Sequence, residues 1–430
     1  MPDLLAARSQ MALSLAFHIL FAVAGIGLPL LMVLAERRWQ RTGDPAALDL
    51  AQRWAKGAAI LFAVGAVSGT VLSFELGLLW PRFMAVAGPI IGMPFSLEGF
   101  AFFTEAIFLG VFLYGRGRIP PRAHLLSGVA VAASGAISGI FVVIVNAWMN
   151  TPTGFTAVGG RIVDVDPIAG MLNPAAFSQC LHMTLASYAA TGFAVAGIHA
   201  VLLLRNPGSA FHRLALRLAL IVGVPAALLQ PVSGDISARM VARTQPAKLA
   251  AMEGQFTTER GAPLRIGGWP DAEARTTRFA LEIPRGLSLL AFHDPAAEVQ
   301  GLDAFPRDDW PPVWPVHVSF QIMVALGSLM ALISLAVLVL AVRRRAAADT
   351  RWLLRTLVVL APAGFVAVEA GWVVTEVGRQ PWVIQGLLRT RDAVTPMPGL
   401  IVPFTTITIL YLLLGAAAAW LLYRQVVKTA

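Results

Sequence analysis

Two glutamates lie seven residues apart inside an otherwise apolar stretch of the sequence, at Glu98 and Glu105. A carboxylate in the hydrocarbon core of a membrane is energetically expensive, so it marks a functional site by default. Seven residues make about two helical turns, or roughly 10 Å along one helix face. Two carboxyls stacked in this way are suited to carry protons along a path or to face a cofactor as ligands.

The composition indicates which elements must hold these carboxylates. Of the 430 residues, 57% are hydrophobic and only 13% are charged, whereas soluble domains carry about 25% charged residues. We therefore predict an all-α polytopic membrane protein with about nine transmembrane helices. The predicted spans lie at 11–35, 57–79, 93–114, 125–149, 180–204, 215–234, 318–343, 354–376 and 399–423.

The predicted spans divide the chain into three parts. Residues 1–234 hold helices one to six, residues 235–317 form a long polar connection, and residues 318–430 hold helices seven to nine. Connections of this length are usually functional or disordered. We interpret this one as a lid over a site at the outer surface, with a solvated cap as the alternative. Within it, residues 245–253 predict a short helix with polar groups that a ligand headgroup could meet: Gln245, Lys248 and Glu253.

The net charge of +9 could indicate a nucleic-acid ligand, but the distribution of the charge argues against that class. Segments on one side of the predicted membrane hold 18 Lys and Arg, those on the other side hold 6, and the remaining 9 lie in the long connection. Because positive residues favour the cytoplasmic side, this bias places the N-terminus outside and the C-terminus in the cytoplasm. The long connection is then external.

The single cysteine, Cys180, limits the redox chemistry available to the chain. It excludes an internal disulfide, cysteine-ligated zinc sites and iron–sulfur clusters. It also excludes covalent c-type haem, which needs a pair of cysteines followed by histidine. Any redox cofactor must therefore be held by His, Met or carboxylate side chains.

Side chains of this kind gather at one depth, in the outer third of the predicted membrane. His and Met are the usual axial pair of a low-spin haem, whereas a single His or carboxylate leaves an open position for a small gas. Each residue could also have a plainer role, because a His can join two helices, a Met can fill the core and a Glu can pair with a nearby Arg. The candidates are His18, Glu98, His182, Met323 and Glu376.

Other polar residues of the apolar stretches carry less specific predictions. We expect Glu75 at the membrane interface, and we expect His199 and His212 to be solvated or to snorkel at the cytoplasmic end. Glu369 lies seven residues inward of Glu376 and so repeats the spacing of the first two carboxylates.

Five segments of the sequence resemble those of cytochrome bd-type quinol oxidase, subunit I. The resemblance covers essentially the whole chain, including nine helices and a long external connection after the sixth. This connection is similar to that of the short-loop, cyanide-insensitive branch. The segments are R-S-Q-M-A at 8–12 leading to F-H at 17–18, E-G-F-A-F-F at 98–103, V-N-A-W-M-N-T-P at 145–152, S-F-Q-I-M-V at 319–324 and the highly specific G-W-x-x-x-E-x-G-R-Q-P-W at 371–382.

The resemblance implies a set of haem ligands. His182 and Met323 match the axial ligands of a low-spin haem b. His18 and Glu376 match the ligands of two high-spin haems, one a haem b and the other a haem d or a third haem b. Glu98 matches a carboxylate beside the oxygen-reducing haem and is a possible ligand of its iron.

The resemblance also implies roles in proton and quinol chemistry. Glu105 matches the acid on the inward proton path. Lys248 and Glu253 match residues implicated in quinol oxidation. Trp372 matches an aromatic side chain between haems, and Arg379 matches a cation that could pair with haem propionates.

The sequence departs from the family pattern at two positions. Gln321 stands where some relatives carry Arg beside the Met ligand. We therefore expect a lower potential of the low-spin haem or a less well paired propionate. Asn150 stands where Gln is common.

The implied function is that of a respiratory terminal oxidase subunit in the bacterial cytoplasmic (inner) membrane. Membrane quinol is oxidised at the outer face, O2 is reduced to water, and charge separation without proton pumping generates a proton motive force. The implied partners are a homologous membrane subunit II and a small accessory subunit, with no nucleic acid.

Three other classes of protein compete with this interpretation. A secondary transporter predicts internal repeats with broken helices at matching positions, and we find no such repeat in the sequence. A quinone dehydrogenase that passes electrons to a partner leaves His18 and Glu376 without a role. A purely structural membrane subunit does not account for ligand-type side chains at a common depth.

Overall fold

The computed structural model describes residues 1–158, 161–343 and 346–427. Within these ranges, nine helices are long and apolar enough to cross a membrane, which confirms the prediction of an all-α polytopic membrane protein. They are α1 (Asp3–Thr42), α2 (Pro45–Leu79), α3 (Pro81–Tyr114), α4 (Pro121–Asn150), α6 (Ala176–Arg205), α7 (Ala210–Thr244), α10 (Val313–Val342), the pair α11 (Arg351–Leu360) and α12 (Ala363–Val377), and α14 (Ile401–Val427).

The ends of these helices follow from the local sequence. The Asp44 and Ser209 side chains accept hydrogen bonds from backbone N–H groups in the first turns of α2 and α7, as good capping residues do. Gly43 ends α1 with a φ of 69°, which costs glycine nothing because it has no Cβ. The eighth span breaks beside Pro362, between α11 and α12, because proline has no N–H to donate within a helix.

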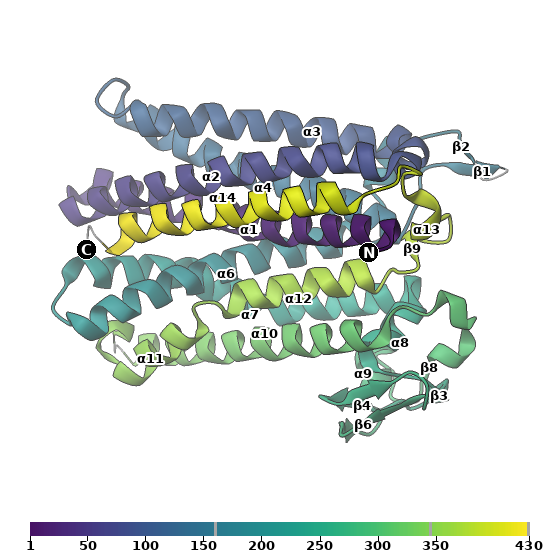
Figure 1. The fold of residues 1–430 in the computed structure, drawn as a ribbon. Coiled ribbons are helices and arrows are strands. Elements are labelled where there is room, and N and C mark those ends of the chain that lie inside the picture. Colours follow the sequence, from purple (N-terminus) through teal and green to yellow (C-terminus); the bar gives the residue numbers. More distant parts are fainter. Residues whose placement is uncertain (159–160, 344–345, 428–430) are drawn as a thin grey trace.

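The helices form one bundle in which α1 packs on α2, α3 on α4 and α6 on α7 (Figure 1). Lipid tails are as apolar as leucine, so close packing rather than exclusion of water holds membrane helices together. Small residues permit such packing where α6 crosses α7. A Cβ added to Gly192 would lie 2.5 Å from the Gly223 Cα, so a larger residue at this position would push the two helices apart.

Short elements connect the spans. Between α4 and α6 lie β1 (Thr156–Val158), β2 (Arg161–Val163) and α5 (Pro167–Met171); between α10 and α11 lies η3 (Ala347–Asp349); and between α12 and α14 lie β9 (Trp382–Ile384), β10 (Leu388–Arg389) and α13 (Thr390–Ala393).

The long connection between α7 and α10 has a small fold of its own. It begins with α8 (Pro246–Glu253), which confirms the short helix predicted at 245–253. Three antiparallel strand pairs follow, along with further short helices. These elements are β3 (Glu259–Arg260) with β8 (Glu298–Val299), β4 (Leu264–Ile266) with β7 (Leu281–Ile283), β5 (Trp269–Asp271) with β6 (Thr276–Arg278), α9 (Gly286–Phe292), η1 (Leu302–Ala304) and η2 (Arg307–Asp309).

The predicted limits of this connection, 235 and 317, do not coincide with the ends of the flanking helices. Helix α7 continues to Thr244 and α10 already begins at Val313. The apolar pattern stops at 234, but the next turns of α7 remain helical with polar side chains. Arg239 donates to Asp235 one turn earlier at 2.5 Å, and such pairs four residues apart stabilise a helix.

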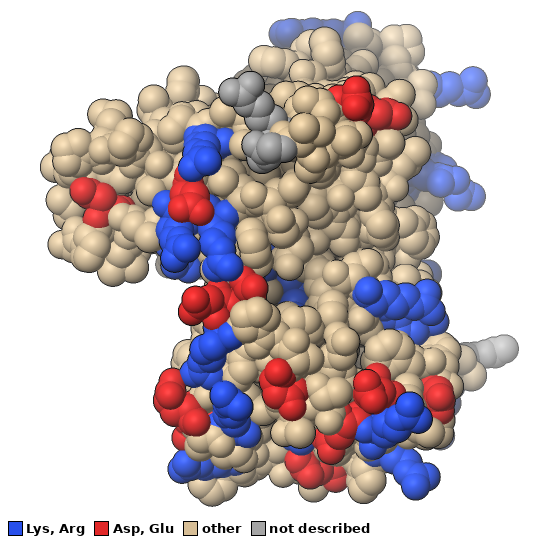
Figure 2. Space-filling view, turned by 90° about the vertical axis from the view of Figure 1, so that its right-hand side faces the viewer, with Lys and Arg blue, Asp and Glu red and all other residues tan. Residues whose placement is uncertain are grey.

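The long connection lies at the same end of the bundle as the N-terminus, and α14 ends at the opposite end (Figure 1). Figure 2 shows the first of these ends, with basic and acidic side chains intermingled over its lower part. Exposed ion pairs such as Arg278–Asp271 at 3.0 Å contribute little stability. The connection is held instead by small apolar clusters, one of which contains Leu249, Leu287 and Val299.

Candidate functional site

His18 on α1 makes a hydrogen bond through Nδ1 with a serine of α2. Its Nδ1 lies 2.9 Å from the Ser68 Oγ on α2, and this hydroxyl itself donates to the Val64 carbonyl oxygen at 3.0 Å. If the serine proton goes to this carbonyl, Nδ1 is the donor of the His18–Ser68 contact. Nε2 then keeps its lone pair, as in metal-bound histidines oriented through their other nitrogen. A Cβ at Gly69 would lie 3.1 Å from the His18 Cε1, so glycine makes room for the ring.

His182 on α6 repeats this arrangement with α7. Its Nδ1 lies 2.9 Å from the Ser233 Oγ, and that hydroxyl donates to the Gln230 carbonyl oxygen at 2.9 Å. The His182 Nε2 lies 3.1 Å from the Gln230 Nε2. A Cβ at Gly234 would lie 3.6 Å from the His182 Cε1. Two histidines from different helix pairs therefore have the same kind of serine partner at Nδ1.

Met323 on α10 lies against a glycine of α12. A Cβ added to Gly371 would lie 3.0 Å from the Met323 Sδ. Helix α10 packs on α7 and α12, and α6 packs on the same two helices. Helix α6, which carries His182, and helix α10, which carries Met323, therefore both pack on α7 and α12.

Glu376 at the end of α12 has both carboxylate oxygens paired. The Arg379 Nη2 donates to Oε2 at 2.5 Å, and the Asn146 Nδ2 of α4 donates to Oε1. Pairing with Arg379 was predicted as an alternative role of Glu376, and the contact itself is confirmed. It is not a solvent-exposed pair, however, because the Arg379 side chain is only 2% exposed.

Glu98 and Glu105 both face α4, as their spacing on α3 predicts. Glu98 accepts a hydrogen bond from the Ser138 Oγ at 3.0 Å. A Cβ at Gly135 would lie 3.1 Å from the Glu105 Oε1. Glycine at that position lets the deeper carboxylate approach the α4 backbone. The two carboxylates therefore line one interface between helices.

The polar residues of α8 face the protein interior. Lys248 and Glu253 are each only 4% exposed. The Lys248 Nζ donates to the Asn150 Oδ1 at 2.5 Å and to the Thr375 carbonyl oxygen at 3.3 Å. Burial, together with the nearby charge of Arg379, lowers the pKa of Lys248 to about 7.

Glu253 is the second buried titratable group of α8. Burial raises the pKa of its carboxyl to about 8, against the opposing influence of the Arg265 charge. Its Oε2 is buried without a hydrogen-bond partner among the described residues. Gln245, at the start of the same helix, is also 4% exposed, and neither end of its amide has a partner in the described chain. These polar atoms are available to a molecule that enters from the end of the bundle.

The residues around Glu376 fit a haem. The Arg379 Nε and Nη1 and the Trp372 Nε1 are buried donors without partners in the described part of the chain, and such donors are rare in folded proteins. Haem propionates are acceptors that could satisfy the arginine. In residues 1–158, 161–343 and 346–427, no three His, Cys, Asp or Glu side chains form a group that could hold a metal ion. Haem iron needs only one or two axial ligands from the protein, so single and paired side chains suffice.

The prediction of solvated or snorkelling histidines was wrong, because His199 and His212 are only 7% and 8% exposed. The tight packing of α6 on α7 brings their Nδ1 atoms to 3.1 Å from each other. Glu75 is buried against α1, where the Gln10 Nε2 and Ser14 Oγ both donate to its Oε1, at 2.9 and 2.8 Å. Its depth at the membrane interface stays a prediction.

The Gln321 side chain is engaged with the long connection. Its Nε2 donates to the Arg265 carbonyl oxygen at 3.0 Å, and its Oε1 accepts from the Gly267 N–H at 2.9 Å. The amide thus ties the turn after β4 to α10, two residues before Met323. The expected effect of this residue on a haem potential stays a prediction.

Three partners of the candidate ligands were missed from the sequence. Ser68 and Ser233 gave no useful signal, because serines in membrane helices commonly bond to their own backbone. Asn146 could have been found, since an amide inside the apolar stretch 125–149 is itself an intramembrane polar group.

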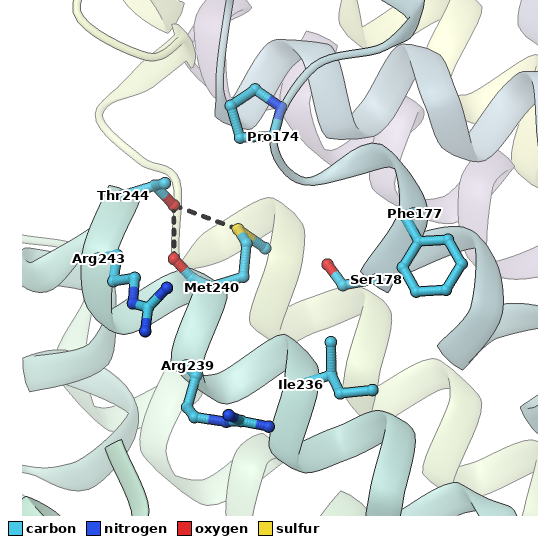
Figure 3. A pocket seen from close by; sticks show the side chains of 8 residues that line it. All are labelled: Pro174, Phe177, Ser178, Ile236, Arg239, Met240, Arg243 and Thr244. Carbon is cyan, nitrogen blue, oxygen red and sulfur yellow. Dashed lines mark hydrogen bonds between the residues drawn. The ribbon is translucent and has the colours of Figure 1, made fainter. Parts of the chain in front are cut away.

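A pocket of about 350 Å³ lies elsewhere, where α6 begins and α7 ends (Figure 3). Arg239 and Arg243 reach its edge from α7, and Thr244 donates to the Met240 carbonyl oxygen at 2.8 Å beside it. None of the candidate ligands lines this pocket. Its lining is Pro174, Phe177, Ser178, Ile236, Arg239, Met240, Arg243 and Thr244.

The fold and the site together define a multi-pass membrane protein with side chains suited to hold haem. Comparisons with known proteins agree with this class. Residues 6–430 match the family model described as cytochrome bd terminal oxidase subunit I. The chain therefore belongs to the cytochrome bd terminal oxidase subunit I family.

Individual relatives match over nearly their whole length. A Bacillus subtilis (strain 168) protein provisionally named cytochrome bd menaquinol oxidase subunit I is 39% identical over 98% of this chain and 96% of its own. The cytochrome bd-II ubiquinol oxidase subunit 1 of Escherichia coli (strain K12) is 30% identical over 90% of this chain and 88% of its own. A chain of the solved bd oxidase from Geobacillus thermodenitrificans superposes with a TM-score of 0.93 at 37% identity, over 100% of this chain and 99% of that one.

Proposed function

We propose that this chain takes electrons from membrane quinol and delivers them to O2, as the haem-bearing subunit I of a cytochrome bd-type quinol:oxygen oxidoreductase. Family membership and the names of the relatives support the reaction. One structural observation carries the assignment of residues. His18 and His182 each have Nδ1 within hydrogen-bond distance of a serine that also lies near a backbone carbonyl oxygen, which supports Nε2 as the ligand atom.

Four side chains would hold the haems. His182 and Met323 would be the axial ligands of a low-spin haem b. His18 and Glu376 would be the ligands of the high-spin haems, a haem b and either a haem d or a third haem b, with Glu98 beside the oxygen-reducing one. When bound, these groups supply one-electron transfer and O2 reduction.

The protein side chains orient these groups. Ser68 and Ser233 fix the planes of the two histidine rings through Nδ1. Arg379 and Asn146 hold the two oxygens of the Glu376 carboxylate. Trp372 fills the space one turn before Glu376 on the same helix, where it would lie between haems.

Quinol oxidation would take place beside α8. A quinol releases two protons as it gives up its electrons, so the site needs groups that accept protons near neutral pH. Lys248 and Glu253 have pKa values of about 7 and about 8, which suit them to this task. Residues 235–317 would then form the quinol-side unit, between the membrane units 1–234 and 318–430. This arrangement requires the quinol side to be the outer face, with the N-terminus outside and the C-terminus cytoplasmic.

Protons for O2 reduction would come from the opposite side of the membrane. Glu98 and Glu105 line the interface of α3 and α4, with Glu105 deeper. They are placed to pass protons from the cytoplasm toward the haems. Since quinol protons leave on the outside and reduction consumes protons from the inside, charge separation arises without a pump.

The assembly follows from family membership. Subunit I works with a homologous membrane subunit II, quinol and O2. We place the complex in the bacterial cytoplasmic (inner) membrane and expect a small accessory subunit to join it.

The rate of quinol oxidation should rise with pH through the range of about 7 to 8. Lys248 can accept a proton only above its pKa of about 7, and Glu253 only above its pKa of about 8. The measurement is the pH dependence of kcat/KM for quinol with the purified complex. Glu253→Gln should remove the step near pH 8 and keep the lower one. A rate that falls across this range would contradict the assignment of these residues as proton acceptors.

Gly371→Ala should weaken ligation of the low-spin haem. A Cβ at this position would lie 3.0 Å from the Met323 Sδ, so the sulfur must move. We expect part of the low-spin haem to become high-spin, seen as a loss of its sharp reduced α-band. Gly327→Ala is the matched control on the helix that carries Met323, since nothing lies within 4 Å of a Cβ at that position. Equal spectra of the two variants would argue against Met323 as a ligand.

Oxygen uptake tests the proposed reaction directly. The complex of subunits I and II, purified in detergent, should consume O2 when reduced quinol is added and should produce the oxidised quinone in proportion. A haem-containing complex that oxidises quinol only with an artificial acceptor would indicate a dehydrogenase. A complex that lacks quinol oxidation altogether would refute the proposal.

A further inference from the structure

A row of hydrogen bonds runs from α8 to the end of α12 through two asparagines of α4. The Lys248 Nζ donates to the Asn150 Oδ1 at 2.5 Å. The Asn150 Nδ2 donates to the backbone oxygen of Asn146 at 2.9 Å and to its Oδ1 at 3.2 Å. The Asn146 Nδ2 then donates to the Glu376 Oε1. The row therefore joins the buried lysine of α8 to one carboxylate oxygen of Glu376, which pairs with the buried Arg379.

Thr375 of α12 contacts three members of this row. Its Oγ1 donates to the Asn146 Oδ1 at 3.2 Å and lies 3.3 Å from the Asn150 Nδ2, while its carbonyl oxygen accepts from Lys248 at 3.3 Å. These contacts fix which way each amide points. Lys248 is the donor of its contact with Asn150, so Asn150 presents its oxygen to the lysine and its nitrogen to Asn146.

Three of the four members of the row are buried, and the Glu376 side chain at its end is 25% exposed. Lys248, Asn150 and Asn146 are 4%, 1% and 7% exposed. Hydrogen bonds between buried groups polarise one another and are costly to leave unmade. A displacement of Lys248 therefore leaves a buried amide without its partner, and this cost favours a rearrangement of the neighbouring groups.

We infer that Asn146 is a positioning residue for the Glu376 carboxylate and that Asn150 links this position to Lys248, so that the two ends of the row are coupled. The inference rests on the proposed function, in which Lys248 belongs to the quinol site and Glu376 to a haem site. A quinol headgroup that draws Lys248 away from Asn150 releases the Asn150 amide. Asn146 then loses a partner, and Glu376 keeps only Arg379 as a fixed one.

Asn146→Leu in the complete two-subunit complex tests the first half of the inference. Leucine has a similar volume but cannot donate to Glu376. Loss of a residue that orients a metal ligand typically costs about 10–100-fold in metal affinity or activity. We expect a loss of about 10-fold or more in occupancy of the Glu376-dependent high-spin haem or in turnover. The remaining haem should show a shifted spectrum and midpoint potential, with unchanged bands of the low-spin haem.

Two further variants separate this role from a purely structural one. Asn146→Asp keeps an acceptor and removes the donor, so it should shift the same haem even if the leucine variant fails to assemble. Thr151→Val is the matched control at the end of α4. Its hydroxyl donates to the Ala147 carbonyl oxygen and to the Asn173 Oδ1 at 3.1 Å each, outside the row. An Asn146 variant with the spectrum and potential of Thr151→Val would overturn the positioning role.

A double-mutant cycle tests the coupling. The midpoint potential of the same haem is measured in the wild type, Lys248→Met, Asn150→Leu and the double variant. We expect the shift caused by Lys248→Met to vanish once Asn150 is leucine, and to persist in Asn150→Gln. Additive shifts would overturn the coupling. A wild-type complex without haem or without quinol oxidation would instead refute the proposed function, so the two failures are distinguishable.

Discussion

Replacement of His182 by alanine should remove the low-spin haem and lower quinol-driven oxygen uptake at least about 100-fold. Loss of a residue that merely orients a metal ligand typically costs about 10–100-fold, so loss of the ligand itself should cost more. His182 contacts Ser233 and Gln230 through its ring nitrogens, and alanine replaces neither contact. The measurement combines the reduced haem spectrum of the purified complex with its rate of O2 consumption.

His199→Ala is the matched control for this experiment. It removes a second buried histidine from the same helix, one that bonds to His212 and has no part in the proposed haem sites. We expect this variant to keep the low-spin haem. If His182→Ala also kept the reduced band of that haem, His182 could not be its ligand.

Replacement of Glu105 by alanine should slow oxygen turnover by about 100-fold or more, since a positioned proton-transfer group contributes typically 10²–10⁴-fold. The low-spin haem should still be reduced by quinol, because Glu105 lies on α3, apart from α8 and from the helices α6 and α10 that carry His182 and Met323. Single-turnover reduction by quinol, followed in the haem spectrum, separates this defect from a loss of quinol oxidation.

Glu105→Gln distinguishes a proton carrier from a packing residue. Glutamine keeps the shape of the side chain against Gly135 but cannot release a proton. The same loss in the glutamine and alanine variants would support a role in proton transfer. Turnover restored by glutamine would assign Glu105 a packing role, and unchanged turnover in both variants would exclude it from the path.

The membrane fold could be predicted from the sequence because an apolar stretch of about 20 residues with few charges is typical of a helix that spans a membrane. The ends of the spans were harder to predict. Helix α7 continues beyond residue 234 to Thr244, through a turn stabilised by the ion pair of Arg239 with Asp235. Composition alone cannot distinguish such a polar helical turn from the start of a loop.

The candidate ligands could also be proposed from the sequence, since His18 and His182 are rare and costly in apolar stretches. Their serine partners could not, because a serine that holds a histidine looks the same in sequence as one that bonds to its own helix. The burial of Glu75 could not be predicted for a related reason. Its partners Gln10 and Ser14 lie on another helix, and only the packing of α1 on α2 brings them together.

The contacts of Lys248 were the hardest to predict from the sequence. They join α8 with the ends of α4 and α12, which are about 100 residues or more away along the chain in either direction. No periodicity or local motif predicts such a meeting. Asn150 could be recognised in the sequence as a departure from the family pattern, but its bond to the lysine gives that departure a physical meaning.

The most direct measurement is the dithionite-reduced minus air-oxidised spectrum of the purified complex, repeated with quinol as the reductant and with the extracted haems identified by mass. We expect the bands of a low-spin haem b together with those of high-spin haems, and we expect quinol to reduce the low-spin haem as dithionite does. A spectrum without haem bands, or a low-spin haem that dithionite reduces and quinol does not, would contradict the proposal that electrons pass from quinol to O2 through haems held by this chain.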